Sequence, residues 1–401
     1  MTESSHPRGL QLNPRFALEM REALTRAWDN HREEIETLAP GAIGILTSGS
    51  TQSQAHEVSI VILSAEAVKT SALAVNRHLG LKPGHVWGLM LPMFHVGGYM
   101  IPVRAMLSGT RVARFDEDWR PESAVRFLAE NGVTHLSWVP TQVYDVVAAG
   151  LAAPPSLQAV IVGGGRLDPS LKRQGQALGW PLLESYGMTE FCSQIATELA
   201  APCTTADVNG WMKVLSHVEV ATEEGSSGRL MVRSASCFSG RLIVDLVTGE
   251  SNLFKREGKA DFWLTQDRVE VRRQPDGAWL KFVGRVADVV KVLGENVDLA
   301  RVRRYVNEAL AFGGQASEGL AAGSWEIVAL PDARREHEIV LVVESSEQVE
   351  LLKELRQRLG VKLLPIELPT RVCVVREIPR SSLGKVKFPE LRELLTEASK
   401  I

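Results

Sequence analysis

Cysteine is scarce in this chain of 401 residues, and its four cysteines stand far apart without a C-x-x-C pair. Such spacing suits neither a zinc site nor a disulfide framework. It favours cysteines that act as small buried hydrophobic residues in a reducing cytoplasm. The four are Cys192, Cys203, Cys237 and Cys373.

Long apolar runs are also absent. No stretch approaches the ~18 consecutive apolar residues that indicate a membrane-spanning helix. The first residues, MTESSHPRGLQLNPRF, carry proline and charge where a signal peptide needs an apolar run. We therefore expect a cytoplasmic protein with no membrane insertion.

Neither sign of charge is in large excess. The chain has 45 Lys plus Arg against 48 Asp plus Glu, and its net charge of -3 provides no global basic field for nucleic acid. With 45% hydrophobic and 23% charged residues, the composition excludes a disordered or collagen-like chain. The length suggests two or three globular domains, at ~100 to 200 residues each.

Apolar runs rich in β-forming residues alternate with segments of helical period from Ser59 to Tyr186. This alternation predicts a largely parallel sheet that helices cover on both faces. The predicted strands lie within residues 86–91, 110–115, 134–140, 158–164 and 181–187. The predicted segments of helical period are one that ends at Leu107, one with Pro121 in its first turn, one that runs through Val147 and one that begins at Asp168.

The pattern changes after residue 210, where short alternating runs between Gly-rich turns predict antiparallel hairpins. Beyond residue 285 we expect a small α+β unit with a helix after Asp298, strands WEIVAL, EIVLVV and RVCVV, a helix over 347–359 and a last helix from Pro389. The fold class is therefore α/β. A large domain over residues 1–284 combines a mainly parallel sheet with a β-rich antiparallel part, and a small α+β domain covers 285–401.

The first chemical motif is ILTSGSTQSQ, in which an apolar run breaks into hydroxyl residues and a glycine. Backbone N–H groups and hydroxyls in such a loop can surround a polyphosphate, although most Ser/Thr/Gly clusters are solvated turns. It is not a Walker A loop, because no G-K-[ST] follows. The candidate residues are Thr47, Ser48, Gly49, Ser50 and Thr51.

Two further motifs follow predicted strands, at the sheet edge where open α/β sheets bind ligands. In Gly163, Gly164 and Gly165, missing side chains would let a ring or phosphate approach the backbone, although a tight strand-to-helix turn explains them equally well. ESYGMTEF offers the ring of Tyr186, the hydroxyl of Thr189 and the carboxylate of Glu190. A lone Thr-Glu pair is more often a helix cap than a metal ligand.

The last two motifs lie near the C-terminus. In WLTQDRVE and VGRVADVVKVLGENV, Asp267 could accept hydrogen bonds from ribose hydroxyls, and Arg285 could hold the same sugar or a phosphate. In EIPRSSLGKVKF, Lys385 follows proline, serines and glycine, which suggests a mobile tether that delivers one ammonium group. A surface turn is the competing interpretation of each motif alone.

Together these motifs closely resemble the adenylate-forming superfamily of acyl-CoA synthetases, luciferases and peptide-synthetase adenylation domains. Their order is a Ser/Thr/Gly loop, a glycine turn, Y-G-x-T-E, T-x-D, G-R-x-x-D-x-x-K and P-R-x-x-x-G-K, from about Ile43 to Phe388. LPMFHVGGYMIPVRAMLSG, YGMTEF and TQDRVE are most similar to the o-succinylbenzoate-CoA ligase subgroup, which serves menaquinone synthesis.

The resemblance implies a two-step reaction. A carboxylic acid, best guessed as o-succinylbenzoate, attacks the α-phosphate of MgATP to give an acyl adenylate and pyrophosphate, and the thiol of coenzyme A then displaces AMP. ATP, Mg²⁺ and coenzyme A are the implied cofactor and co-substrates.

The resemblance also implies a role for each motif. The loop from Thr47 would hold the β- and γ-phosphates, and Thr189 would contact the α-phosphate. Glu190 would hold Mg²⁺, and Asp267 with Arg285 would grip the ribose. The adenine would lie among Gly163, Gly164, Gly165 and Tyr186, with Glu184, Ser185 and Gly187 as further nucleotide-binding residues; Gly187 and Met188 would also contact the acid.

Relatives rotate their small domain between the two steps. Lys385 would bridge the carboxylate and the α-phosphate during adenylation, and the face with Gly294, Glu295 and Asn296 would then turn inward to form the coenzyme A tunnel. Lys291 would be a further cofactor-binding residue. The hinge would follow Gly284-Arg285, the pair at which the small domain begins.

Two residues in the predicted acid site have alternatives. His95 lies near the acyl pocket in relatives, but it could be a core histidine. Arg104 stands in the apolar run MIPVRAML, where an arginine is costly to bury unless it is paired. We predict that it binds the carboxylate that is not activated; a structural ion pair or a side chain that reaches solvent is the alternative.

The chain departs from the family at several positions. Gln52, Gln54 and Ala55 replace the Gly, Pro and Lys of the relatives' phosphate loop, Ala287 replaces a polar hinge residue, and Phe388 stands where a basic residue is common. Only about 40 residues precede the loop, so we expect an N-terminally abridged large domain whose missing layer a partner, a homodimer contact or exposed core replaces. Transfer to a carrier-protein thiol and a nucleotide-binding homologue without turnover are the competing functions.

Overall fold

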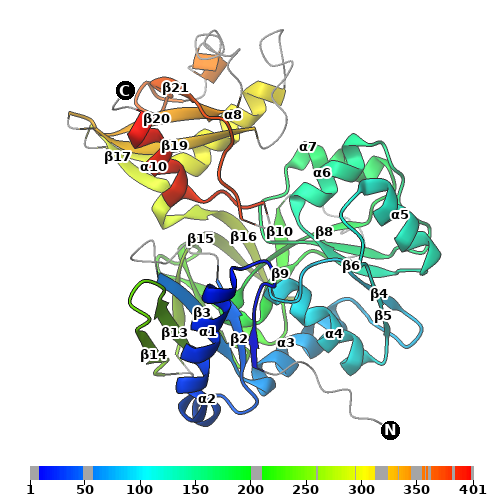
Figure 1. Cartoon of the computed structure of the whole chain (residues 1–401). Coiled ribbons are helices and arrows are strands. Elements are labelled where there is room, and N and C mark those ends of the chain that lie inside the picture. The colour runs from blue at the N-terminus through cyan, green and yellow to red at the C-terminus, as the bar shows by residue number, and fades with distance from the viewer. Residues whose placement is uncertain are drawn as a thin grey trace. The chain divides into compact units, whose positions relative to one another are not determined.

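Two compact units divide the chain (Figure 1). Unit 1 comprises Met1–Thr265 and Glu270–Phe282, and unit 2 comprises Gln266–Val269 and Val283–Ile401. The structure is a computed structural model. It describes residues 9–47, 57–199, 210–258, 261–293, 295–311, 324–332, 334–344, 355–356, 358–359, 363–381 and 384–398.

The predicted parallel sheet is present in unit 1 as part of an eleven-stranded sheet, in the order β5-β4-β6-β7-β8 from one edge. Every neighbouring pair among these five strands is parallel, as the alternation of strands and helices predicted. The strands are β4 (Val86–Leu89), β5 (Arg111–Arg114), β6 (His135–Trp138), β7 (Ala159–Val162) and β8 (Leu182–Met188). The helices are α3 (Ala65–His78), α4 (Val96–Ser108), α5 (Pro121–Glu130), α6 (Pro140–Ala148) and α7 (Pro169–Ala177).

Helices cover both faces of this parallel part (Figure 1). Ile101 and Ala105 of α4 pack with Trp87 and Ile161 on one face. On the opposite face, α5 and α6 contribute Leu128, Val143 and Val146 to a cluster that includes Trp138 and Val160. Adjacent strand residues thus enter different cores, which explains the nearly continuous apolar strands in the sequence.

The other half of the sheet is antiparallel around β9 and β10, and its hairpin β11–β12 confirms the predicted change of pattern after residue 210. A single 3-10 turn, η1 (Thr189–Phe191), connects β8 to β9. The strands are β9 (Ser193–Thr197), β10 (Trp211–Val214), β11 (Val218–Thr222), β12 (Ser227–Ser234), β15 (Trp263–Gln274) and β16 (Gly277–Arg285). β15 and β16 contribute residues to both units.

The prediction that the alternation begins at Ser59 was wrong for the first strand. β3 pairs antiparallel with β2 and β13 in a separate five-stranded sheet of order β1-β2-β3-β13-β14. Both faces of β3 are buried, so its apolar run looks like that of a parallel strand. The strands are β1 (Gly9–Gln11), β2 (Ile43–Leu46), β3 (Glu57–Leu63), β13 (Gly240–Asp245) and β14 (Ser251–Lys255).

Two helices before β2 cover one face of this second sheet (Figure 1). Leu24 and Trp28 of α1 (Leu18–Asn30) and Ile35 of α2 (Arg32–Leu38) pack on Ile60 and Leu242. These two helices thus cover one face of the sheet, and the homodimer contact stays a prediction. Among the described residues, no helix is long and apolar enough to cross a membrane.

Unit 2 contains the predicted α+β arrangement. Alternate residues of its three-stranded sheet β19-β20-β21 enter two different cores, one with α8 and the other with α10. The elements are η2 (Val286–Asp288), β17 (Val289–Val292), β18 (Glu295–Asp298), α8 (Leu299–Ala311), β19 (Trp325–Asp332), β20 (Glu336–Val343), β21 (Arg371–Val374) and α10 (Phe388–Ala398). Most of the helix predicted over 347–359 lies outside the described residues.

None of the described cysteines forms a disulfide. Cys192 and Cys237 are buried, as predicted, whereas Cys373 is only half-buried. Burial, followed by the neighbouring Cys237, raises the pKa of the Cys192 thiol. Cys203 lies outside the described residues.

His135 makes the stability of unit 1 depend on pH. Its ring lies in the core of the parallel sheet, 4.9 Å from the ring of His85, with Nδ1 2.9 Å from Thr134 Oγ1. Burial, and secondarily His85, lowers the pKa of His135 to about 4. The folded protein therefore keeps this ring neutral, whereas an unfolded chain protonates it below about pH 6.5, so stability falls as the pH drops from about 6.5 towards 4.

From pH 7 to pH 5 the free energy of unfolding should fall in the wild type. We expect it to fall by about 2 kcal/mol less in His135→Gln. Urea unfolding followed by tryptophan fluorescence at both pH values measures this difference. His337→Gln is the control, because His337 is only half-buried and belongs to unit 2. Identical pH dependence in the wild type and His135→Gln would contradict the assignment.

Candidate active-site residues in each unit

The glycine turn of unit 1 follows β7 directly. Gly163 N–H donates to the Trp138 carbonyl at 3.1 Å, and Gly164 has a φ of +79°, which favours glycine. A Cβ on Gly163 would lie 3.6 Å from the Ser185 carbonyl oxygen, an ordinary contact distance. The turn therefore leaves an open backbone surface beside the end of β8.

The end of β8 presents the predicted ring and glycine. Tyr186 stacks on Phe282 with ring centroids 5.7 Å apart, so Phe282 covers one face of the tyrosine ring. Gly187 is exposed, and Met188 is half-buried beside it. Ser185 Oγ lies 3.0 Å from Thr197 Oγ1, which ties this hydroxyl to β9.

Glu184 is committed to a partly buried ion-pair cluster. Lys172 Nζ lies 3.0 Å from Glu184 Oε1 and 2.6 Å from Glu198 Oε1, and Glu198 also accepts the Glu184 backbone N–H. Burial alone would lower the pKa of Lys172, but the two glutamates outweigh burial and raise it. The Glu184 carboxylate and N–H are therefore both engaged within the chain, and the predicted role of Glu184 in nucleotide binding stays a prediction.

Glu190 lies in η1 and forms an ion pair with Arg241 of β13. Arg241 Nη2 donates to Glu190 Oε1 at 2.7 Å, and the Glu190 carbonyl accepts the Phe238 N–H at 2.7 Å. A carboxylate next to the Thr189 hydroxyl provides hard oxygen donors, which fit Mg²⁺. Among the described residues no three acidic, histidine or cysteine side chains form a metal cluster. One carboxylate suits Mg²⁺ that is shared with substrate phosphates.

Only the first residue of the predicted phosphate loop is described. Thr47 N–H donates to the Ser59 carbonyl at 3.0 Å, so the loop begins where β2 and β3 are still hydrogen-bonded. Ser48, Gly49, Ser50 and Thr51 lie outside the described residues.

His95 and Arg104 both belong to α4. His95 precedes the first turn and is only half-buried, with its ring 4.6 Å from that of Phe94, so it is not a core histidine. Arg104 is 1% exposed, which excludes a side chain that reaches solvent. The structure records no ion pair for Arg104 within the described part of the chain, and its Nε and Nη2 are buried without a hydrogen-bond partner.

Trp87, Asn76 and His217 lie near Arg104, and each has a buried polar atom without a hydrogen-bond partner. Its guanidinium lies 5.9 Å from the ring centre of Trp87, and its backbone carbonyl accepts a hydrogen bond from Asn76. Burial lowers the pKa of Arg104 to about 9, so the side chain keeps its charge at neutral pH. Burial, and secondarily Arg104, lowers the pKa of His217 to about 4, so that ring is neutral.

Unit 2 brings Asp267 and Arg285 together, eighteen positions apart in the sequence. Arg285 Nε donates to Asp267 Oδ1 at 3.1 Å, and the Arg285 N–H donates to Asp288. Asp267 is buried, whereas the Arg285 side chain is 48% exposed. The predicted ribose-binding pair therefore exists as a pair, and its ligand stays a prediction.

The residues that precede Lys385 are hydrogen-bonded to it and to Gly384, and its role as a mobile tether stays a prediction. Arg380 forms a bridge with Val386, the Arg380 side chain donates to the Gly384 carbonyl at 2.9 Å, and Ser381 N–H donates to the Lys385 carbonyl at 2.7 Å. The Lys385 residue is exposed. The arginine closes the turn, which the residue types alone did not indicate.

The remaining predicted residues of unit 2 lie around β17. Lys291 is exposed on this strand, opposite Asn296 of β18, and its carbonyl contacts His337 Nδ1 at 3.0 Å. Gly294 lies outside the described residues, so the coenzyme A face stays a prediction.

Sequence reasoning missed Arg241, Lys172 and His217. Arg241 is 51 positions from Glu190, and nothing in the run SGRLIVD indicates that partner. Lys172 occurs on an exposed-looking helix, and only the pairing of β8 and β9 places Glu184 and Glu198 beside it. No local pattern could have identified these contacts.

The architecture and these residues define the class of protein. The profile of the AMP-binding enzyme family matches residues 21–242, and the chain belongs to this family. The predicted resemblance to adenylate-forming enzymes is thereby confirmed.

Relatives within that class share one name. The 2-succinylbenzoate–CoA ligase of Bacillus cereus is 26% identical over 88% of this chain and 70% of its own length. The enzyme of that name from Staphylococcus epidermidis is 24% identical over 80% of this chain and 64% of its own length. The chain thus spans about two thirds of these relatives.

The chain is also similar to solved structures of MenE. MenE from Escherichia coli, with a bound analogue of OSB-AMS, is 25% identical, with a TM-score of 0.60 over 88% of this chain and 69% of that one. MenE from Bacillus subtilis, in complex with ATP and magnesium ion, is 21% identical, with a TM-score of 0.69 over 87% of this chain and 69% of that one. The predicted fold is confirmed by these neighbours.

Proposed function

We propose that this protein is an ATP-dependent acid–CoA ligase that adenylates an aromatic diacid, o-succinylbenzoate, and transfers its acyl group to coenzyme A. The carrying observation is the buried guanidinium of Arg104, whose Nε and Nη2 have no partner. An arginine that keeps its charge without an ion pair is costly to the fold. A substrate carboxylate that pairs with it on binding would account for that cost.

Arg104 lies well inside α4. His95 precedes this helix, and Arg104 follows nine residues later. At ~1.5 Å per residue their Cα atoms are about 13 Å apart, so Arg104 is more than two turns from the end of the helix that His95 precedes. One carboxylate would bind Arg104 while the other reaches the nucleotide near Thr189.

The other residues supply binding and charge. Glu190 would hold Mg²⁺, which neutralises the phosphates of ATP, and Asp267 with Arg285 would hold the ribose. Lys385 would stabilise the charge that develops between the carboxylate and the α-phosphate. Residues 285–401 would turn after adenylation to bring the face of Lys291 to coenzyme A, which makes them a mobile domain.

We expect Arg104→Met to weaken binding of the diacid ~10 to 100-fold, because a charge-assisted hydrogen bond is worth about 1.5 to 3 kcal/mol. A related monoacid that lacks the second carboxylate should bind equally well to the wild type and the variant. Thermal stability should not fall, because methionine removes a buried unpaired charge. Calorimetric titration and thermal unfolding measure these effects.

Arg126→Met is the matched control, since Arg126 is an exposed arginine of unit 1. If Arg104→Met bound the diacid as tightly as the wild type does, Arg104 would not bind the second carboxylate, and the main support for the proposed substrate would be lost. Equal losses for diacid and monoacid would assign Arg104 to packing of the pocket.

The reaction itself is tested by pyrophosphate release with a panel of aryl and fatty acids, with and without coenzyme A. The expected result is release with o-succinylbenzoate and formation of its CoA thioester, identified by mass spectrometry. No release with any acid would favour a nucleotide-binding homologue, and release without thioester formation would favour a carrier-protein acceptor.

A further inference from the structure

Arg241 has unused hydrogen-bonding capacity beside the predicted Mg²⁺ ligand. Its Nη2 donates to Glu190 Oε1 at 2.7 Å, whereas its Nε is buried without a partner. The guanidinium has five N–H donors, and a single contact to a carboxylate leaves most of them unused. An arginine that served only as a structural ion pair would normally satisfy more of them.

The strand register places Arg241 near the start of the phosphate loop. Arg241 lies opposite Val61, and Ile243 lies opposite Ser59, the residue whose carbonyl binds Thr47 N–H. Two residues of a strand span about 7 Å, a distance that an arginine side chain can cover. Arg241 thus contacts Glu190 and lies on the strand next to β3, two positions along the register from Ser59.

The same face of the sheet carries another unused polar group. Ile60, Leu242 and Val244 point into the core under α1 and α2, so Ser59 and Arg241 point to the opposite face. The Ser59 hydroxyl is buried there without a hydrogen-bond partner. A buried hydroxyl and a buried guanidinium N–H without partners indicate a place where an anion is expected.

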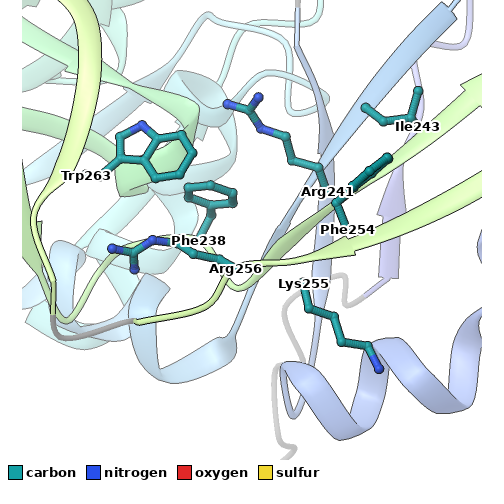
Figure 2. A pocket seen from close by; sticks show the side chains of 7 residues that line it. All are labelled: Phe238, Arg241, Ile243, Phe254, Lys255, Arg256 and Trp263. Atoms are coloured by element: carbon teal, nitrogen blue, oxygen red, sulfur yellow. The ribbon is translucent and has the colours of Figure 1, made fainter.

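A pocket of about 340 Å³ adjoins Arg241 (Figure 2). Arg241 and Arg256 lie on opposite sides of the Phe238–Trp263 ring pair, each with its guanidinium between 5.2 and 5.8 Å from the two ring centres. Lys255 points away from these rings and forms an ion pair with Glu34 at 3.4 Å. Of the three cations in the pocket wall, Arg241 is therefore the one that contacts Glu190.

The segment between β2 and β3 provides no cationic side chain that could contact a phosphate. Residues 47–56 contain no lysine or arginine. A bound triphosphate there would receive no cation from these residues, although phosphate oxygens are best held by charge-assisted donors.

We propose that Arg241 binds the β- or γ-phosphate of ATP, and pyrophosphate after cleavage, beside the Mg²⁺ ligand Glu190. This inference rests on the proposed function. Arg241 keeps one donor on Glu190, which positions the carboxylate, and directs its remaining donors to phosphate oxygens. AMP has no β- or γ-phosphate and makes no use of Arg241.

Calorimetric titration with AMP, ATP and pyrophosphate, each with Mg²⁺, tests the proposal. We expect Arg241→Gln to weaken the binding of ATP and of pyrophosphate ~10 to 100-fold. Its affinity for AMP should stay within ~2-fold of the wild-type value. Arg241→Lys should lie in between, because it keeps the charge and loses the fork of donors. Arg233→Gln is the matched control, because Arg233 also pairs with a glutamate, Glu219, at an exposed position.

The outcomes separate this inference from the proposed function. If the wild type binds AMP and ATP and Arg241→Gln binds ATP equally well, the inference fails alone. Equal losses for AMP and ATP would assign Arg241 to structure and overturn it. If the wild type binds neither nucleotide, both proposals fail. If Arg241→Gln does not fold, the test uses the ratio of the ATP and AMP affinities of Arg241→Lys. A ratio equal to that of the wild type overturns the inference.

Discussion

Replacement of Lys385 by alanine is expected to slow acyl-adenylate formation ~10² to 10³-fold, the usual loss when one preorganised donor to a developing charge is removed. The effect should appear in kcat and not in ATP binding, because the proposed contact forms in the transition state. The exposed turn that carries Lys385 is closed by Arg380 and Ser381 through backbone carbonyls, so alanine should leave it intact.

Two half-reactions make this prediction specific. ATP–pyrophosphate exchange reports adenylation, and conversion of a synthetic acyl adenylate by coenzyme A reports thioester formation. The second should stay within ~3-fold in Lys385→Ala, because the proposed domain rotation removes Lys385 from the site before that step.

Lys387 offers a control on the same turn. It is exposed, and its Nζ lies 2.8 Å from Glu390 Oε1. Lys387→Ala should change neither half-reaction by more than ~2-fold. Equal losses of exchange in Lys385→Ala and Lys387→Ala, or equal losses of both half-reactions in Lys385→Ala, would contradict the assigned role.

Elements with a clear local period could be predicted from the sequence. Asp168 is the N-cap of α7, which begins at Pro169. Its carboxylate accepts hydrogen bonds from the N–H groups of Ser170 and Leu171. The strands β4 to β8 follow their apolar runs, since a strand that is buried on both faces tolerates few polar residues. The pairing of strands was harder to predict from the sequence. β3 was assigned to the wrong sheet because its partner β13 lies about 180 positions later.

The candidate site shows the same division. Asp267 and Arg285 were predicted together because motifs mark both, and the structure pairs them. The Glu190–Arg241 pair was missed because strand pairing alone brings the two residues together. The unpaired state of Arg104 was also beyond the sequence, since a buried arginine predicts a partner and only packing shows whether one is present.

Gly187 carries the second large prediction, because no other residue fits its position. A Cβ on Gly187 would lie 1.7 Å from the Ser193 carbonyl oxygen and 2.6 Å from its carbon. Ser193 and Cys192 already have positive φ values of 93° and 55°, so the turn from η1 into β9 has little freedom to move. The added methyl group therefore meets backbone and not a flexible side chain.

We expect Gly187→Ala to destabilise unit 1 by about 3 kcal/mol, the upper range for overpacking, and to lower its melting temperature by about 5 to 10 °C. Gly163→Ala is the matched control, because its Cβ would meet nothing closer than the Ser185 carbonyl oxygen at 3.6 Å. Calorimetric unfolding compares the two variants with the wild type. Equal melting temperatures for Gly187→Ala and Gly163→Ala would show that the turn yields to the methyl group. A loss confined to Gly187→Ala would show that the close approach of β8 and β9 at this turn leaves no room for a side chain.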